Sequence, residues 1–188
     1  MAAQIYQIHL SLQESAPEIW RRLLVHPETT LVDLHRIIQT VMGWTNSHLH
    51  QFVHGQVYYA PKEFEIDYAK NSRKVKLNTV MKKENDHILY EYDFGDSWLH
   101  DIILEKILPF DKTVQIPGCM DGRGNCPPED CGGIWGYQDL VAILSNPKHK
   151  DYLRKSEWLG SELDPDYFDK EVINKQLTEP DYGCIWLE

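Results

Sequence analysis

Residues 87–108 read HILYEYDFGDSWLHDIILEKIL. Two runs rich in β-branched and aromatic side chains flank Gly95-Asp96, and both runs are long enough to form strands. A glycine at the first central position suits a two-residue type II′ turn. The stretch therefore predicts an antiparallel hairpin, from which the rest of the chain can be interpreted.

The two-residue turn determines which side chains face each other across this hairpin. Glu91 is expected opposite His100, and Asp93 opposite Trp98, so that all four side chains share one face. A carboxylate opposite an imidazole orients the ring and raises its basicity, as in metal sites and general bases. The same pair is also typical of an ordinary cross-strand ion pair. Both interpretations stay open at this point.

The segments before this hairpin predict two more strands and a helix. Residues 6–12 alternate apolar and polar side chains and residues 19–25 are β-rich, so the two are expected to pair as a second antiparallel hairpin. Apolar side chains then recur at helical spacing between Thr30, which resembles the start of a capping box, and Gly43, where a C-terminal cap is expected. This is the clearest helix in the sequence.

The remaining segments are less regular. Residues 61–86 are polar and lysine-rich, which predicts a surface connection with at most one short helix. Residues 109–133 contain four prolines and five glycines, which is typical of a long functional loop; its apolar anchors indicate that it is ordered against the sheet. Three helices are expected after it, over residues 137–144, 148–158 and 165–177.

Because most strands precede most helices, the sequence predicts an α+β fold. We expect a mostly antiparallel or mixed sheet built from hairpins, with one early helix and about three C-terminal helices packed on it. The 188 residues are the length of one ordinary domain, so residues 1–188 are interpreted as a single domain.

Composition narrows the class of protein. The 19 Lys and Arg against 29 Asp and Glu give a net charge of −10, which argues against a long nucleic-acid groove or a cationic membrane face. No apolar run approaches the roughly 20 residues that span a bilayer, and the N-terminus shows no signal-peptide pattern. The four cysteines are too few for a disulfide scaffold. A cytoplasmic location is expected.

A histidine cluster lies after the predicted helix. If residues 48–53 and 56–59 are strands around a turn at His54-Gly55, then His48, His50 and His54 share one strand face. A His-x-His spacing places two imidazoles where they can bind one metal ion. The alternative is that these rings are hydrogen-bonded residues at the edge of a sheet.

The cysteines and the carboxylates of the 109–133 loop can each be interpreted in two ways. Cys119, Cys126 and Cys131, completed by Cys184 or by a histidine such as His100, offer a zinc site, although their spacing fits no standard pair of cysteine knuckles. The alternative is that they pack as small apolar groups. Next to them, Glu129 and Asp130 either cap the following helix or contribute to a site near the polar face of the hairpin.

Sequence patterns of several enzyme classes are absent. There is no phosphate-binding Gly-x-x-x-x-Gly-Lys, no Gly-x-Ser-x-Gly elbow, no His-Glu-x-x-His and no dinucleotide fingerprint. Asp93-Phe94-Gly95 matches a kinase magnesium motif, but the other kinase motifs are missing, so a kinase is excluded.

Five ordered motifs over residues 6–177 closely resemble the plasmid pRiA4b ORF-3-like family. The motifs are Pro17-x-Ile19-Trp20-Arg21-Arg22, Leu31-x-x-Leu34-His35-x-x-Ile38-Gln39, Trp44-x-x-x-His48-Leu49-His50-x-Phe52, Tyr92-x-Phe94-Gly95-Asp96-Ser97-Trp98-x-His100 and Pro127-Pro128-Glu129-Asp130-x-Gly132-Gly133-x-x-Gly136-Tyr137. The resemblance implies a small α+β domain from bacteria and archaea, often encoded on plasmids or beside mobile elements, with no established activity. It therefore says more about the fold than about the function.

We expect a non-enzymatic binding module associated with such contexts, whose partner is a protein, a peptide or a small polar ligand. Two alternatives stay open. One is a metal-dependent hydrolase with His and carboxylate ligands. The other is a mobile-element accessory protein that touches DNA through Arg21, Arg22 and the lysines of residues 70–83. The predicted recognition surface consists of His48, His50, Asp93, Asp96, Trp98, His100, Glu129 and Asp130.

Overall fold

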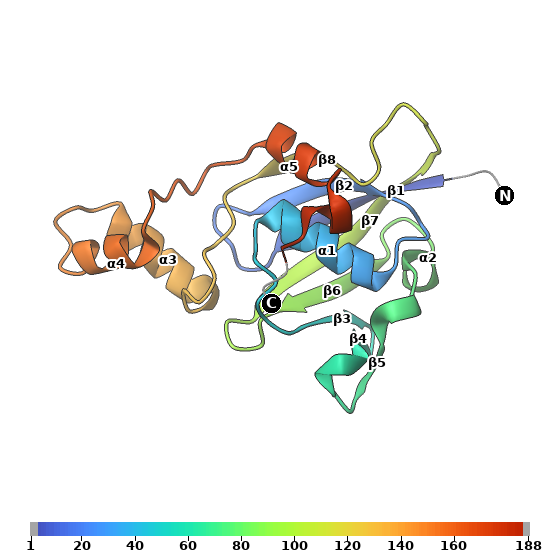
Figure 1. Ribbon diagram of the computed structural model, residues 1–188, viewed down its shortest axis with the longest axis horizontal. Coiled ribbons are helices and arrows are strands. Elements are labelled where there is room, and N and C mark those ends of the chain that lie inside the picture. The colour runs from blue at the N-terminus through green and yellow to red at the C-terminus, as the bar shows by residue number, and fades with distance from the viewer. Residues whose placement is uncertain (1–3, 186–188) are drawn as a thin grey trace.

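A computed structural model of the chain, described here over residues 4–185, has the α+β architecture that the sequence predicts (Figure 1). Its strands form one eight-stranded sheet in the order β5-β4-β3-β6-β7-β1-β2-β8, in which only the β4–β5 pair is parallel. The strands are β1 (Gln4–Leu12), β2 (Trp20–Val25), β3 (His50–His54), β4 (Val57–Ala60), β5 (Ala69–Asn71), β6 (His87–Tyr92), β7 (Trp98–Pro109) and β8 (Gly118–Arg123).

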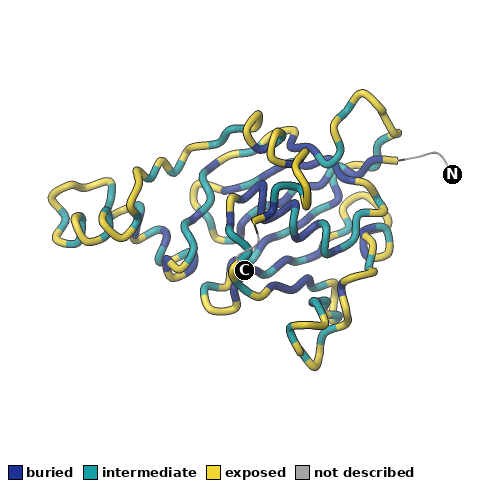
Figure 2. The backbone as a smooth tube through the Cα atoms, viewed as in Figure 1, coloured by how far each residue is buried: buried dark blue, intermediate teal, exposed yellow. Residues whose placement is uncertain are grey.

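Helix α1 lies across one face of this sheet, and the other helices lie around the sheet's periphery (Figure 1). The helices are α1 (Leu31–Met42), α2 (Leu77–Val80), α3 (Gly133–Leu144), α4 (Tyr152–Leu159) and α5 (Lys170–Gln176), with 3-10 turns η1 (Lys62–Phe64), η2 (Ser72–Lys74) and η3 (Pro180–Gly183). Burial is concentrated in α1 and the central strands, whereas α3 and α4 extend from one end, and most of their residues are exposed or only partly buried (Figure 2). No helix within residues 4–185 combines the length and hydropathy that a bilayer span requires.

The first hairpin and the first helix are confirmed. β1 and β2 pair antiparallel from Tyr6↔Val25 to Ser11↔Trp20. In α1, the Thr30 side chain accepts a hydrogen bond from the backbone N–H of Asp33 at 3.1 Å. Gly43 ends the helix in the left-handed conformation at φ 90°, where a side chain would be strained. The apolar stripe of α1 is buried against the sheet.

A buried arginine joins the end of α1 to the sheet edge. Arg21 on β2 is 3% exposed. Its guanidinium donates hydrogen bonds to the backbone carbonyls of Val41 (2.9 Å), Gly124 (2.9 Å), Arg123 (2.8 Å) and Trp20 (2.8 Å). A positive charge is favourable at the carbonyl end of a helix, so this contact stabilises the position of α1 on the sheet.

The register expected for the β6–β7 hairpin is wrong. Tyr92 pairs with Trp98 and Tyr90 with His100, so that residues 93–97 form a five-residue loop instead of a two-residue turn. Glu91 lies opposite Leu99, and Glu91 and His100 therefore point to opposite faces.

The physical reason is the conformation of the loop ends. Asp93 and Ser97 both adopt left-handed backbone angles, with φ 57° and 53°. The carbonyl of Asp93 accepts a hydrogen bond from the Ser97 N–H at 2.6 Å, and the Asp93 side chain accepts one from the Gly95 N–H at 2.9 Å. Asp tolerates this backbone region because its short polar side chain bonds locally.

Other element boundaries also differ from the predictions. β3 begins at His50, so His48 lies outside the strand, and the tight turn between β3 and β4 falls at residues 55–56. Residues 61–86 contain β5, α2 and two 3-10 turns. The 109–133 segment is ordered against the sheet as expected, but it includes the edge strand β8. The third C-terminal helix begins at Lys170 with Asp169 as its N-cap, later than the expected start at residue 165.

Candidate functional site

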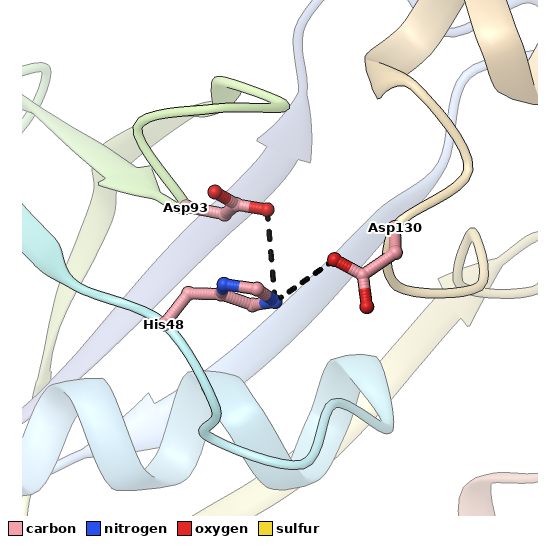
Figure 3. Close-up of side chains that lie close together, drawn as sticks. All are labelled: His48, Asp93 and Asp130. Atoms are coloured by element: carbon pink, nitrogen blue, oxygen red, sulfur yellow. Dashed lines mark ion pairs between the residues drawn. The ribbon is translucent and has the colours of Figure 1, made fainter.

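Three loops bring a histidine and three carboxylates together beside the sheet. Figure 3 shows three of these residues, His48, Asp93 and Asp130. His48 precedes β3, Asp93 begins the β6–β7 loop, and Glu129 and Asp130 precede α3. The Nε2 atom of His48 lies 3.7 Å from Asp93 Oδ2, 3.5 Å from Glu129 Oε2 and 3.4 Å from Asp130 Oδ1. We call these four residues the His48 cluster.

Two of the carboxylates use one oxygen for structure and direct the other at His48. Glu129 Oε1 accepts hydrogen bonds from the Thr45 N–H at 2.7 Å and the Tyr92 hydroxyl at 3.1 Å, while its Oε2 faces His48. Asp93 Oδ1 accepts the Gly95 N–H, while its Oδ2 faces His48. The surrounding chain therefore orients both groups, and each keeps one oxygen for a ligand.

The hydroxyl of Tyr92 links the segment before β3 to Glu129 and so helps to hold the His48 cluster in place. Its hydroxyl accepts a hydrogen bond from the Ser47 N–H at 3.0 Å and donates to Glu129. Burial, and then the charge of Glu129, raise the pKa of Tyr92 above its ordinary value, so the hydroxyl stays protonated as a donor. The sequence offered no signal for the contacts that Thr45 and Tyr92 make, because they join segments far apart in the chain.

The loops that carry the aspartates are held in uncommon backbone conformations. Asp130 has φ 59°, in the same left-handed region as Asp93. Such backbone angles are sparsely populated by residues other than glycine and concentrate at functional sites. Asp96 accepts a hydrogen bond from the Gly132 N–H at 3.1 Å, which ties the two aspartate-bearing loops together.

The contacts in the His48 cluster are longer than direct hydrogen bonds, and their geometry fits either ion pairs or ligands of one shared metal ion. Within residues 4–185, His48 Nε2 has no hydrogen-bond partner, and its contacts of 3.4 to 3.7 Å exceed the usual 2.7–3.2 Å. Neighbouring ligands on a tetrahedral ion, each about 2.1 Å from it, lie about 3.4 Å apart. One ligand atom each from His48, Asp93 and Asp130 lie within 4.8 Å of one another.

The cluster has a buried side and an open side. Asp93 is buried and the Glu129 side chain is only 15% exposed, whereas the Asp130 side chain is 73% exposed. An ion held by these residues would have free coordination positions on the side of Asp130. Neither Glu129 nor Asp130 caps α3, because Gly132 occupies its N-cap position and no side chain bonds there.

Three residues expected on the recognition surface are buried outside the His48 cluster. His50, Trp98 and His100 are 5%, 1% and 0% exposed. His100 donates its Nδ1–H to the Trp98 carbonyl at 3.0 Å, and burial lowers its pKa to about 4. His50 stacks on His35 with ring centroids 3.4 Å apart, so it does not share a ligand with His48. The one-residue register difference puts Trp98 and His100 on the covered face of the sheet.

The cysteines lie outside the His48 cluster. All four are free thiols, and Cys119 and Cys131 belong to the hydrophobic core, as expected of small packed groups. Burial raises the pKa of Cys119 to about 11 and that of Cys131 to about 12, and it raises that of Cys126 well above its ordinary value. Protonated thiols are poor metal ligands. The group with metal-ligand spacing within residues 4–185 contains no cysteine.

The arginines proposed for DNA contact are both engaged. Arg21 is buried by its carbonyl partners. Arg22 forms a bidentate pair with Glu105 at 2.7 and 2.9 Å. Arg21 is therefore not available to phosphates, and Arg22 already has a carboxylate partner, which leaves the lysines of residues 70–83 as the unassigned basic groups of that alternative.

Comparisons with known proteins agree with this fold. The chain is 37% identical over 163 residues to the uncharacterised protein y4hQ of Sinorhizobium fredii (strain NBRC 101917 / NGR234), covering 86% of this chain and 84% of that one. It is 36% identical to MM3350 of Methanosarcina mazei Go1, whose crystal structure is described as that of a protein of unknown function. That comparison has a TM-score of 0.81 and covers 91% of this chain and 98% of the other.

Residues 4–172 match the family described as Plasmid pRiA4b ORF-3-like protein. The matched residues include the whole His48 cluster and all eight strands of the sheet. Nine-tenths of the chain lies within this match. The chain belongs to the plasmid pRiA4b ORF-3-like family.

Proposed function

We propose that this protein is a metal-dependent binding module, in which a divalent ion held by His48, Asp93 and Asp130 binds a small polar ligand through its open coordination positions. One observation carries the proposal. Asp93 Oδ2 and Asp130 Oδ1 approach His48 Nε2 at distances too long for hydrogen bonds, and one ligand atom from each of the three residues lies within 4.8 Å of the others, as expected for ligands of one ion.

The charge balance supports a cation at this position. Three carboxylates around one imidazole repel each other, and two of them are largely buried. A divalent ion neutralises most of this charge, and the protein already holds Asp93 and Glu129 in place through Gly95, Thr45 and Tyr92. Such bonds to ligand-bearing carboxylates orient them and increase metal affinity.

The chemistry of the three proposed ligands indicates which metal ions would bind. One imidazole nitrogen with two carboxylates suits Zn²⁺, Mn²⁺ or Fe²⁺, whereas Ca²⁺ and Mg²⁺ prefer oxygen ligands alone. With three protein ligands, the ion keeps at least one position for water or for a polar group of the ligand.

The test is metal binding in solution. Protein purified without an affinity tag is analysed by plasma mass spectrometry, and metal-free protein is titrated calorimetrically with Zn²⁺ and Mn²⁺. We expect about one ion per chain, and at least about tenfold weaker binding in His48→Gln and in Asp130→Asn. His54→Gln, which removes an exposed histidine at the end of β3, is the matched control. Equal affinity in all four proteins would contradict the proposal.

A metal-dependent hydrolase is the second candidate, and the open side of the cluster at Asp130 favours it. A metal ion with a free position lowers the pKa of bound water and supplies a nucleophile. Metal-loaded protein is assayed with p-nitrophenyl phosphate and p-nitrophenyl acetate. Turnover that disappears in His48→Gln would favour the hydrolase, and turnover equal to that of buffer would leave the binding module.

A further inference from the structure

A cavity of about 450 Å³ lies on the far side of His48, between the first half of α1, the start of β3, η1 and η2. Its volume is in the range of small-molecule sites. Apolar side chains, among them Val32, Leu49 and Phe64, form much of its wall, and His50 lines it as well.

His50 is a buried polar group that the protein leaves without a partner. The His50 residue is only 5% exposed, and neither ring nitrogen has a hydrogen-bond partner within residues 4–185. A neutral imidazole presents one donor and one acceptor.

The neighbouring His35 ring, in contrast, has hydrogen-bond partners at both nitrogens. His35 Nδ1 lies 2.9 Å from the Tyr90 hydroxyl, and His35 Nε2 lies 2.8 Å from Asn46 Oδ1. Gln39 closes the network, because it donates to the Tyr90 hydroxyl at 3.0 Å and accepts from the Asn46 N–H at 2.9 Å. His35 is therefore fully bonded, whereas His50, stacked directly on it, is not.

The mouth of the cavity carries a readily displaced ion pair. Arg73 contacts Glu63 at 3.2 Å, and these side chains are 70% and 61% exposed. Exposed pairs of this kind are weak, so the guanidinium can exchange its partner for a carboxylate of a bound molecule. The cavity thus combines a buried, unpartnered imidazole in its lining, an apolar wall and a cationic mouth.

We propose that this cavity binds a small phenolic carboxylate: a flat aromatic ring whose hydroxyl bonds to His50 and whose carboxylate meets Arg73. A hydroxyl both donates and accepts, as a neutral imidazole does. The ring packs edge or face against Phe64, which lies 5.2 Å from His50 in a T-shaped arrangement. His48 also lines this cavity, but the proposed ligand requires no metal ion, so binding to metal-free protein tests it separately from the proposed metal site.

The test uses 4-hydroxybenzoate, with benzoate and tyramine as probes that lack the hydroxyl or reverse the charge. NMR of the histidine rings follows each titration in metal-free protein. We expect 4-hydroxybenzoate to shift the His50 ring signals with a dissociation constant on the order of millimolar, as is typical of a ligand this small. Benzoate should bind about tenfold more weakly, since one hydrogen bond is lost, and tyramine should not shift these signals.

Variants locate the site. His50→Phe keeps a flat ring in the core and should weaken 4-hydroxybenzoate binding about tenfold, whereas His54→Phe, exposed on the same strand, should leave binding unchanged. Arg73→Gln alters only the exposed mouth, so it reports even if His50→Phe fails to fold. No shift of the His50 signals by 4-hydroxybenzoate, equal shifts by tyramine, or binding unaffected by Arg73→Gln would each overturn the proposal.

Discussion

Asp96 and Gly133 are in backbone contact across two loops that are remote in sequence. A Cβ on Gly133 would lie 2.5 Å from the Asp96 carbonyl oxygen, and the neighbouring Gly132 N–H donates to the Asp96 carboxylate at 3.1 Å. The first loop carries Asp93 and the second carries Asp130. The spacing of these two carboxylates therefore depends on a contact that only a glycine permits.

Replacing Gly133 by alanine should disturb both the fold and the His48 cluster. Gly133 has φ 67°, and the added methyl group would meet backbone that cannot move without shifting the loop. We expect a loss of about 2–3 kcal/mol in the free energy of unfolding, measured by denaturant titration, together with weaker Zn²⁺ binding.

Gly160→Ala is the matched control for this substitution. Gly160 has φ 69°, but nothing lies within 4 Å of its Cβ position. It should lose only the roughly 1 kcal/mol that the left-handed backbone costs an alanine, with unchanged Zn²⁺ binding. Equal losses in the two variants would show that the contact with Asp96 has no energetic weight.

Adjacent arginines on β2 should differ sharply in their contribution to stability. Arg21→Met leaves the carbonyls of Val41, Gly124 and Arg123 without a buried donor, and should cost about 3 kcal/mol of unfolding free energy. Arg22→Met removes a half-exposed pair with Glu105 and should cost about 1 kcal/mol or less. Thermal unfolding followed by circular dichroism compares the two variants, and the opposite order would contradict the role assigned to Arg21.

Substitutions of the two carboxylates before α3, Glu129 and Asp130, should have different effects on the free energy of unfolding. Glu129→Ala leaves the Thr45 N–H and the Tyr92 hydroxyl without their acceptor, so metal-free protein should lose about 1–2 kcal/mol. Asp130→Asn should leave the stability of metal-free protein unchanged or slightly raise it, because it relieves repulsion at an exposed position. Denaturant titration with a chelator present measures both. A loss near 1 kcal/mol in Asp130→Asn would mean that Asp130 is structural.

Stability should fall as the pH is lowered from about 6.5 to about 4. Burial lowers the pKa values of His35 and His100 from 6.5 to about 4, and it lowers that of His50 well below its ordinary value. Over this window the unfolded chain binds protons that the native state does not, so each histidine removes about 1.4 kcal/mol of unfolding free energy per pH unit. Above pH 6.5 the effect vanishes. Denaturant titrations at several pH values measure the slope, and a flat profile across this window would contradict the assigned burial of these rings.

The sequence was most informative where local patterns and packing agree. The β1–β2 hairpin and the helix from Leu31 to Gly43 follow from alternation, apolar spacing and caps, which are properties of neighbouring residues. The pairing register of β6 and β7 could not be predicted from such local patterns. A two-residue and a five-residue loop differ by the backbone angles of Asp93 and Ser97, which composition does not specify.

The candidate site was predictable only in part. His48, Asp93, Glu129 and Asp130 were expected on one surface, and the structure brings these four together. His50, Trp98 and His100 were grouped with them because the wrong strand assignments placed polar side chains on the open face. Nothing local distinguishes an exposed histidine from a buried neutral one, since burial is decided by α1 packing over the sheet.

Anomalous X-ray diffraction from crystals grown with Zn²⁺ or Mn²⁺ tests the metal site most directly. The account predicts one strong anomalous peak about 2.1 Å from His48 Nε2 and from a carboxylate oxygen of both Asp93 and Asp130, absent in His48→Gln crystals. Crystals in which the ion occupies other positions, with no anomalous peak between His48 Nε2 and these carboxylates, would contradict it.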